Sequence, residues 1–518
     1  MSQPASRRRR LYGGALWRVA AVAALCFAAA SCAPHAQVMC EPLEEAYRGR
    51  LDRAVQALDA TALADSKRGA FLYHAQRGHL LHLEGDAEAS NRELELAVAV
   101  ADALDPPSVS ETLTDYLVNE AVKPYAGEDY ERAYLHYYML LNYLDLGKPG
   151  EALVEAKRLD QVFRNLDARY DDGRYEDDGF IRYLSGLLYE SIGEDDEAFV
   201  DYRLAYRAYS GEPAGFIGPE PAPAGDSVGG FWSGSFGGLP APSGLIASLR
   251  ASAERSGAPD RLDWLPEGSD PGGPGVGEIV ILIESGWAPY KVEESIEVPI
   301  HRALVPEDLR GRTDLAAYVK IAYPALSSVP GGADGFRVEV SAVRESARSR
   351  FASAERVADL DAMVRGVLER RVGAVVFRST LRATAKQIAL MKGKHALEER
   401  REREEDEGGR RRGVLGWLGD VLGWIAEDVA TIAVAESEQA DTRSWVLLPR
   451  EIWMARISVL PGEYEVTVRP GGSGEPLDLG PVLVDEGDKV FESCRIFGGP
   501  HPMRCGSRRA GTRTGRRE

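Results

Sequence analysis

The residue for which the sequence indicates the most specific chemistry is Cys32. It follows a basic stretch at residues 7–10 and an apolar run at residues 19–30, which is too short to cross a bilayer. Small residues at 29–31 stand directly before it, as a signal peptidase requires at its cleavage site. Cleavage there would leave a cysteine at the new N-terminus, where its thiol can carry a lipid.

This arrangement resembles the lipobox of bacterial lipoproteins, in which the thiol receives a diacylglycerol and the new N-terminus is acylated. The departure is Ala28-Ala29, because Leu is usual at position −3. Secretion with cleavage after Ala33 or Ala36, or an uncleaved anchor, are the alternatives. Because Ala33 rather than an acidic residue follows Cys32, we expect a lipid anchor in an outer membrane. The chain would face the periplasm, with the cell surface as the alternative.

The remaining cysteines allow one disulfide in the folded protein. Cys26 is removed with the signal segment, and Cys32 is the lipid site. Cys40, Cys494 and Cys505 therefore remain as possible disulfide partners. Cys494 and Cys505 could pair across a C-terminal loop in an oxidising compartment. The alternative is that all three thiols stay free.

Other chemistry-bearing residues give weaker signals. His74, His79 and His82 lie in one predicted helix, but their spacing is wrong for metal ligands, so we interpret them as its polar face. The acidic segment "DDGRYEDDG" lacks the ligand spacing of a calcium loop and is interpreted as a solvated cap of the next helix. No nucleophile–base set, phosphate loop or cofactor motif is recognised. We therefore predict no catalytic residues, no metal and no cofactor.

The segment "ADTRSW" is the best interaction candidate in the C-terminal half. Asp441, Arg443 and Trp445 alternate along an extended stretch, where Asp and Arg can pair and Trp can seal an interface. The three residues could bind a partner, or they could form a clasp that holds helix to strand.

The N-terminal half must position its residues on helices. Apolar residues recur three and four apart from about residue 41 to 210. Three segments resemble the tetratricopeptide (TPR) pattern, in which glycine ends the first helix and small residues let the second approach. The residues that carry this pattern are Gly78, Gly85, Tyr143, Gly147, Ala152, Gly186, Tyr189, Gly193, Ala198 and Tyr202.

These hairpins predict a binding surface. The turn glycines are unevenly spaced, so we expect a degenerate array of stacked hairpins. Its concave face would bind a peptide or protein, with Tyr134, Tyr137, Tyr138 and Tyr143 as the expected exposed aromatics.

The C-terminal half changes to a strand pattern. Residues 211–276 are rich in Gly and Pro and predict a linker, with a short helix at 245–255. Residues 277–495 predict a β-sandwich-like domain with a helical insertion at about 355–436, and 496–518 a disordered basic tail. A helix from Gly413 to Ala435 packs against its neighbour, or contacts a membrane or a second copy. The fold class is thus multidomain α + β, with a TPR-like array at 41–210 after a signal segment at 1–31.

Four blocks of the sequence together resemble an uncharacterised family of bacterial lipoproteins with a TPR-like N-terminal half. They are "YAGEDYERAYLHYYMLLNYLDLGKPGEALVEAKRLD", "GEIVILIESGWAPYKVE", "LDAMVRGVLERRVGAVVFRSTLRATAKQIA" and "ADTRSWVLLPREIWMARISVLPGEY". The resemblance implies a cell-envelope location and a role through association.

Composition agrees with such a role. The net charge of −19 argues against a nucleic-acid binder. We expect a non-enzymatic scaffold or assembly factor with protein partners, or alternatively a self-associating structural component.

Overall fold

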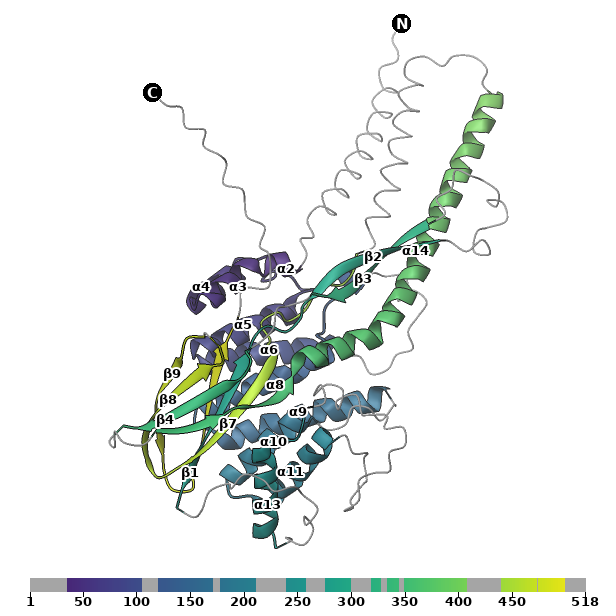
Figure 1. Cartoon of the computed structure of the whole chain (residues 1–518). Coiled ribbons are helices and arrows are strands. Elements are labelled where there is room, and N and C mark those ends of the chain that lie inside the picture. Colours follow the sequence, from purple (N-terminus) through teal and green to yellow (C-terminus); the bar gives the residue numbers. More distant parts are fainter. Residues whose placement is uncertain are drawn as a thin grey trace, which may run out of the picture.

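The computed structural model describes residues 35–104, 120–170, 178–210, 239–257, 275–299, 318–327, 333–343, 349–407, 439–472 and 474–498. Cys32, Cys505 and the segment 413–435 lie outside these residues. Within them the chain is a mixed helical and β protein with a helical repeat region (Figure 1).

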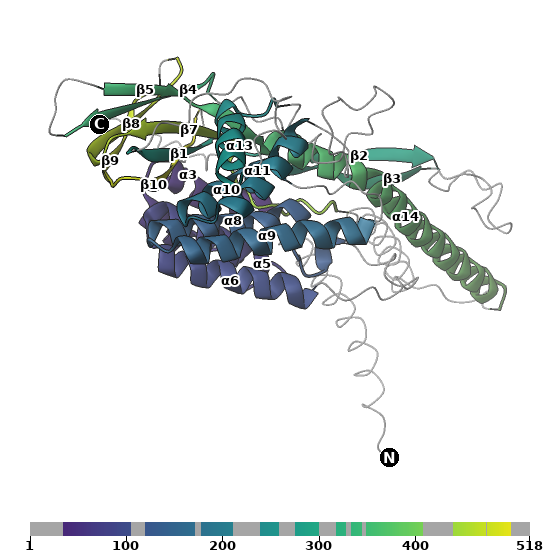
Figure 2. The same ribbon diagram turned by 90° about the horizontal axis from the view of Figure 1, so that it is seen from below.

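Helices fill the N-terminal half as antiparallel hairpins. Their bounds are α2 (His35–Val38), α3 (Cys40–Tyr47), α4 (Leu51–Asp59), α5 (Ala70–Glu84), α6 (Ala87–Leu104), η1 (Glu120–Val122), α8 (Asp129–Asp145), α9 (Pro149–Tyr170), α10 (Gly179–Ser191), α11 (Asp195–Ser210) and α13 (Ser243–Arg255). The pairs α5–α6, α8–α9 and α10–α11 form the three hairpins, and α13 packs on α11. Helices α5, α6, α8, α9 and α10 lie side by side when the molecule is seen from below (Figure 2).

Each hairpin turns at a glycine with a left-handed backbone. Gly85, Gly147 and Gly193 have φ values of 90°, 67° and 82°, which an L side chain adopts only with strain. Two further glycines allow close helix contact, because a Cβ atom at Gly78 would lie 2.7 Å from Leu94 and one at Gly186 would lie 2.5 Å from the Tyr202 ring. These five positions therefore specify both the ends and the spacing of the repeat helices.

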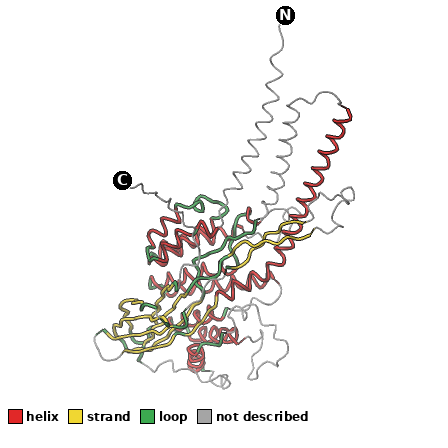
Figure 3. Tube along the Cα trace, turned by 45° about the horizontal axis from the view of Figure 1, so that its top comes forward, coloured by secondary structure: helices red, strands yellow, loops and turns green. Residues whose placement is uncertain are grey.

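Strands β1 (Gly277–Ser285), β6 (Glu355–Asp359), β7 (Glu451–Val459) and β10 (Lys489–Ile496) form the first sheet, in the order β10-β1-β7-β6. Strand β1 runs parallel to β10 and antiparallel to β7. The second sheet is antiparallel and contains β5 (Ser349–Ser353), β4 (Phe336–Ala342), β8 (Gly462–Pro470) and β9 (Leu477–Val484) in that order. The strands of both sheets gather at one end of the molecule (Figure 3).

The central strand β1 explains how the two halves join. Its residues are all buried, as a continuous apolar run predicts for a strand covered on both faces. Val280 and Leu282 pack in one core with the repeat helices, whereas Ile279, Ile281 and Ile283 pack in a second core with the second sheet. The molecule is thus layered as helices, first sheet and second sheet.

A third element extends from this body. Strands β2 (Lys291–Pro299) and β3 (Tyr318–Leu326) form an antiparallel hairpin that packs on α14 (Leu360–Glu407). The long helix extends well beyond the layered body (Figure 1). It begins at Leu360 rather than near 355, because residues 355–359 pair with β7 as β6.

Candidate functional site: a buried charged junction

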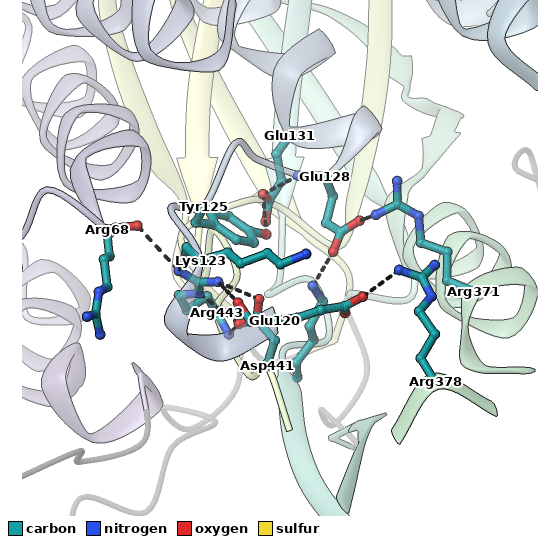
Figure 4. A network of polar contacts seen from close by, with 11 residues as sticks. Arg68, Glu120, Lys123, Tyr125, Glu128, Glu131, Arg371, Arg378, Asp441 and Arg443 are labelled. Carbon is teal, nitrogen blue, oxygen red and sulfur yellow. Dashed lines mark hydrogen bonds and ion pairs between the residues drawn. The ribbon is translucent and has the colours of Figure 1, made fainter. Parts of the chain in front are cut away.

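The segment 439–446 contacts the start of α8 and the chain before it, and these contacts form the junction shown in Figure 4. The Arg443 guanidinium donates to the backbone carbonyls of Glu120 at 2.9 Å and Lys123 at 2.8 Å, and it pairs with Asp441 at 2.7 Å (Figure 4). It also lies 4.9 Å from the centre of the Tyr125 ring. Planar guanidinium groups suit such forked and stacked contacts. Arg443 therefore ties the C-terminal half to the chain before α8.

Glu131 is the acceptor at the centre of the junction. Its carboxylate accepts from the Trp445 backbone N–H at 2.6 Å, the Tyr125 hydroxyl at 2.7 Å and the Glu128 backbone N–H at 2.8 Å. Burial raises the pKa of Glu131 to about 7, although the charge of Lys291 and the backbone donors act in the opposite direction. This carboxyl connects the start of α8 to the crossing segment.

Glu128 connects the same helix start to the extended arm. It caps α8 in a reciprocal pair with Glu131, and it bonds to Lys291 of β2 and to Arg371 of α14. Burial alone would raise the pKa of Glu128, but the two cations lower it to about 2. A second pair on the same side joins Arg378 to Glu120 at 2.8 Å. Four separate parts of the sequence therefore meet at the N-terminus of α8.

Trp445 fills the apolar side of the junction. Its side chain is 2% exposed, and its ring lies 5.7 Å from those of His79 and Tyr138. The neighbouring Ser444 carbonyl lies 3.0 Å from His35 Nε2, and burial lowers the pKa of His35 to about 4. Of the two interpretations of "ADTRSW", the structure shows the clasp: Asp441, Arg443 and Trp445 hold the chain to itself.

The expected binding face of the repeats is consequently closed. Tyr134, Tyr137 and Tyr138 are at most 2% exposed, and only Tyr143 is half-buried. The expectation of exposed aromatics, some of them in the core, is wrong for Tyr134, Tyr137 and Tyr138, which are all core residues. Tyr138 is covered by Trp445 and Glu284 of the C-terminal half. His79 and His82 were likewise predicted on a polar face but are buried, and only His74 of the three is partly exposed.

The other repeat residues lie inside or between the hairpins. Ala152, Ala198 and Tyr202 are fully buried. Tyr189 is half-buried, with the Lys157 ammonium 5.4 Å from its ring centre. Asp178, the last acidic residue of "DDGRYEDDG", caps α10 by accepting from the Ile181 backbone N–H at 3.0 Å. These residues pack within and between the repeat helices, so little of their surface is exposed to a partner.

The disulfide prediction needs correction. Cys494 is a free thiol in the middle of β10, where its pairing opposite Ile283 places it in the sheet. Burial and the charges of Glu284 and Glu492 raise the pKa of this thiol to about 12. Cys40 is disulfide-bonded instead.

The ion pairs and hydrogen bonds of the junction hold distant parts of the chain together. Its charges are paired, and the described residues contain no group of His, Cys, Asp and Glu side chains suited to a metal ion. None of the described helices combines the length and apolar character of a membrane span. Sequence reasoning missed Glu128, Lys291 and Arg371. Only the Glu128-x-x-Glu131 spacing, a capping pattern before an aromatic-rich helix, could have identified part of this set.

No family model and no curated protein matches the chain. Matching solved structures include MamA protein, with 14% identity and a TM-score of 0.26 over 44% of this chain and 85% of that one. YrrB, described as a TPR protein with an unusual peptide-binding site, matches with 12% identity and a TM-score of 0.25 over 44% and 79%. A putative kinesin light chain of Podosopora anserina matches with 13% identity and a TM-score of 0.27 over 44% and 94%. Likenesses at these scores carry no functional argument.

Proposed function

We propose that this protein is a non-enzymatic, lipid-anchored protein of the cell envelope that acts as a scaffold or assembly factor. Cys32, after a basic and an apolar stretch, supports the anchor, and the resemblance to bacterial lipoproteins agrees with it. The anchor would lie in the outer membrane and the folded chain in the periplasm. Because Tyr134, Tyr137 and Tyr138 are buried, these side chains are not available to a partner.

The observation that carries the partner-binding proposal is an outward row of apolar residues on α14. Gly373, Phe377, Leu381 and Ala385 are spaced four apart, which places them along one side of the helix. All four are exposed, and the exposed fractions of Phe377 and Leu381 are 61% and 46%. The opposite side is buried, with Ser379, Arg382 and Ala383 at most 5% exposed.

This row fits a protein partner better than solvent. An exposed apolar row on a helix matches the way in which an amphipathic helix docks into an apolar groove, with contacts at intervals of three and four residues. The junction fixes the base of α14 through Arg371 and Arg378, so the row is held at a set angle to the body. The arm would present the row to a groove on the partner.

Site-specific photocrosslinking in cells tests the partner surface. A photoreactive phenylalanine analogue at Phe377 should give one discrete protein adduct. The matched control is Phe351 of β5, which is 59% exposed on the sandwich and should give none. No adduct at Phe377, or the same adducts at both positions, would contradict the proposal.

The anchor is tested separately. A Cys32→Ser variant should lose labelled palmitate and move from the detergent phase to the aqueous phase on detergent partition. If the variant keeps both label and phase, the anchor is elsewhere.

A second candidate function is self-association as a structural component. The segment from Gly413 to Ala435 follows α14 after residues 408–412, and contact with a second copy is one of the two interpretations of its predicted helix. In that case the Phe377 adduct would have twice the mass of the chain and contain no other protein.

A further inference from the structure

The short helix α2 lies only a few residues from the cysteine that carries the lipid in the proposed function. Its first residue, His35, is 7% exposed, and the His35 Nε2 atom lies 3.0 Å from the Ser444 carbonyl. His35 follows Cys32 by three positions, and an extended chain covers at most about 3.6 Å per residue. A lipid on Cys32 would therefore hold this buried residue within about 11 Å of the membrane surface.

The disulfide of Cys40 connects this end of the molecule to another part of the chain. Cys40 is the first residue of α3 and is disulfide-bonded, whereas Cys494 of β10 is a free thiol. The sequence contains five cysteines, so the partner is Cys26, Cys32 or Cys505. In the proposed function Cys26 is removed with the signal segment and Cys32 carries the lipid. Cys505 is left as the partner, and this assignment rests on the proposed function.

The chain after β10 starts at a place from which Cys505 can reach α3. The Phe497 ring lies 6.5 Å from the ring of Tyr47, the last residue of α3. Seven residues lead from Gly498 to Cys505 and span at most about 25 Å. Helix α3 has eight residues and is about 12 Å long. The available chain is therefore long enough to bring Cys505 to Cys40 at the other end of this helix.

The stretch that surrounds Cys505 is strongly basic. Residues 504–517, here called the basic segment, contain no acidic residue and six arginines: Arg504, Arg508, Arg509, Arg513, Arg516 and Arg517. The whole chain has a net charge of −19, so the basic segment is opposite in sign to the rest. Clustered basic residues beside a membrane anchor bind anionic lipid headgroups, and this attraction extends over about 8 Å at physiological salt. The basic segment must be held close to the membrane for this attraction to act.

We propose that a Cys40–Cys505 disulfide holds the basic segment beside the lipid anchor, where its arginines bind the anionic headgroups of the same membrane. The lipid and the basic segment give two membrane contacts, which restrict how the folded body can turn about its anchor. The disulfide forms when the two thiols pass two electrons and two protons to a disulfide oxidant outside the cytoplasm, which becomes a dithiol.

Mass spectrometry of the unreduced protein, extracted from membranes, tests the disulfide. After digestion without reducing agent, we expect one peptide pair that joins Cys40 to Cys505 and a separate peptide with Cys494 as a thiol. Cys494→Ser is the matched control and should keep the joined pair. Cys40 joined to Cys494, or Cys40 and Cys505 both unpaired, overturns the inference. An acylated Cys32 in the same sample would show that the proposed anchor stands while this inference fails, and Cys40 joined to Cys32 would overturn both.

Fluorescence quenching in reconstituted vesicles tests the membrane contact. The purified lipidated chain carries a fluorescent amino acid at Thr512, and the vesicles carry a quencher on their headgroups. We expect quenching about threefold or more stronger in phosphatidylcholine with phosphatidylglycerol than in phosphatidylcholine alone, and loss of this difference in high salt. A fluorescent amino acid at Leu483, which is 68% exposed on the second sheet, is the control and should show no such difference. Equal quenching at Thr512 in the two vesicle types overturns the inference.

Two variants separate the disulfide from the charge. Cys505→Ser removes the bond and should reduce the difference in quenching at Thr512 by about half or more. The double change Arg508→Gln with Arg509→Gln keeps the bond and should reduce the difference as well, so a misfolded Cys505→Ser would still leave a decisive variant. An unchanged difference in either variant overturns the inference.

Discussion

Two buried glutamates of this protein lie in opposite electrostatic states. Glu128 in the junction bonds to Lys291 and Arg371, and its pKa is lowered to about 2. Glu284 of β1 accepts from the Tyr138 hydroxyl at 3.2 Å, and burial raises its pKa to about 7 although the Arg495 charge and the tyrosine hydroxyls oppose this. Burial is alike at the two sites, so the available cations make the difference. A buried carboxylate that bonds to cations keeps its charge and holds the halves of the molecule together, whereas a buried carboxyl that bonds to a hydroxyl group has a raised pKa.

The largest effect is expected from breaking the paired side of this comparison. Glu128→Gln would leave Lys291 and Arg371 without their shared anion, and removing one member of a buried pair costs about 3–5 kcal/mol. Urea unfolding should show a loss of this order at pH 7. Glu339→Gln, which removes an exposed partner of Arg469, is the control and should change little. Equal losses in the two variants would show that the buried ion pairs of the junction contribute no more to stability than a surface ion pair does.

A smaller loss is expected at the clasp. Arg443→Lys keeps the charge near Asp441 but cannot reproduce the fork to the Glu120 and Lys123 carbonyls. Hydrogen bonds of a charged group contribute about 1.5–3 kcal/mol, so the free energy of unfolding should decrease by an amount in that range. Arg469→Lys on the exposed sheet face serves as the matched control. A Lys variant as stable as the original chain would mean that charge alone, without the fork, holds the segment.

The smallest effect should come from Glu492 of β10. Its pKa is raised, so the folded chain holds its proton more tightly than the unfolded chain does. Stability is therefore lost as pH rises, and Glu492→Gln should raise the free energy of unfolding slightly at pH 8 and not at pH 4. The same small gain at both pH values would point to packing instead of charge.

Local features of the fold could be read from the sequence. Gly85, Gly147 and Gly193 stand where the helical pattern breaks, and only glycine accepts the left-handed turn without strain. The apolar run of β1 likewise indicates a strand buried on both faces. These features depend on neighbouring residues, so their pattern is visible in a short window.

The junction could not be predicted in the same way. Arg443 meets carbonyl groups of residues near 120, about 320 positions earlier, and no local pattern specifies that contact. The sequence of the aromatic-rich helix α8 is the same whether its aromatic side faces a partner or another part of the same chain, so the pattern cannot distinguish the two. The sequence predicts an exposed Tyr138 because the residues that cover it, Glu284 and Trp445, lie far away along the chain.

The most direct test of the account is the stability of Glu284→Gln relative to the original chain, measured by urea unfolding at pH 5 and pH 8. The folded pKa of Glu284, about 7, lies above its usual value of 4.5, so between these values the unfolded chain ionises first and stability falls as pH rises. Glutamine removes this loss. We predict a variant more stable than the original by roughly 1–3 kcal/mol at pH 8, with most of the gain absent at pH 5. A variant that is less stable by the same amount at both pH values would show that Glu284 is a satisfied structural group and would contradict the account.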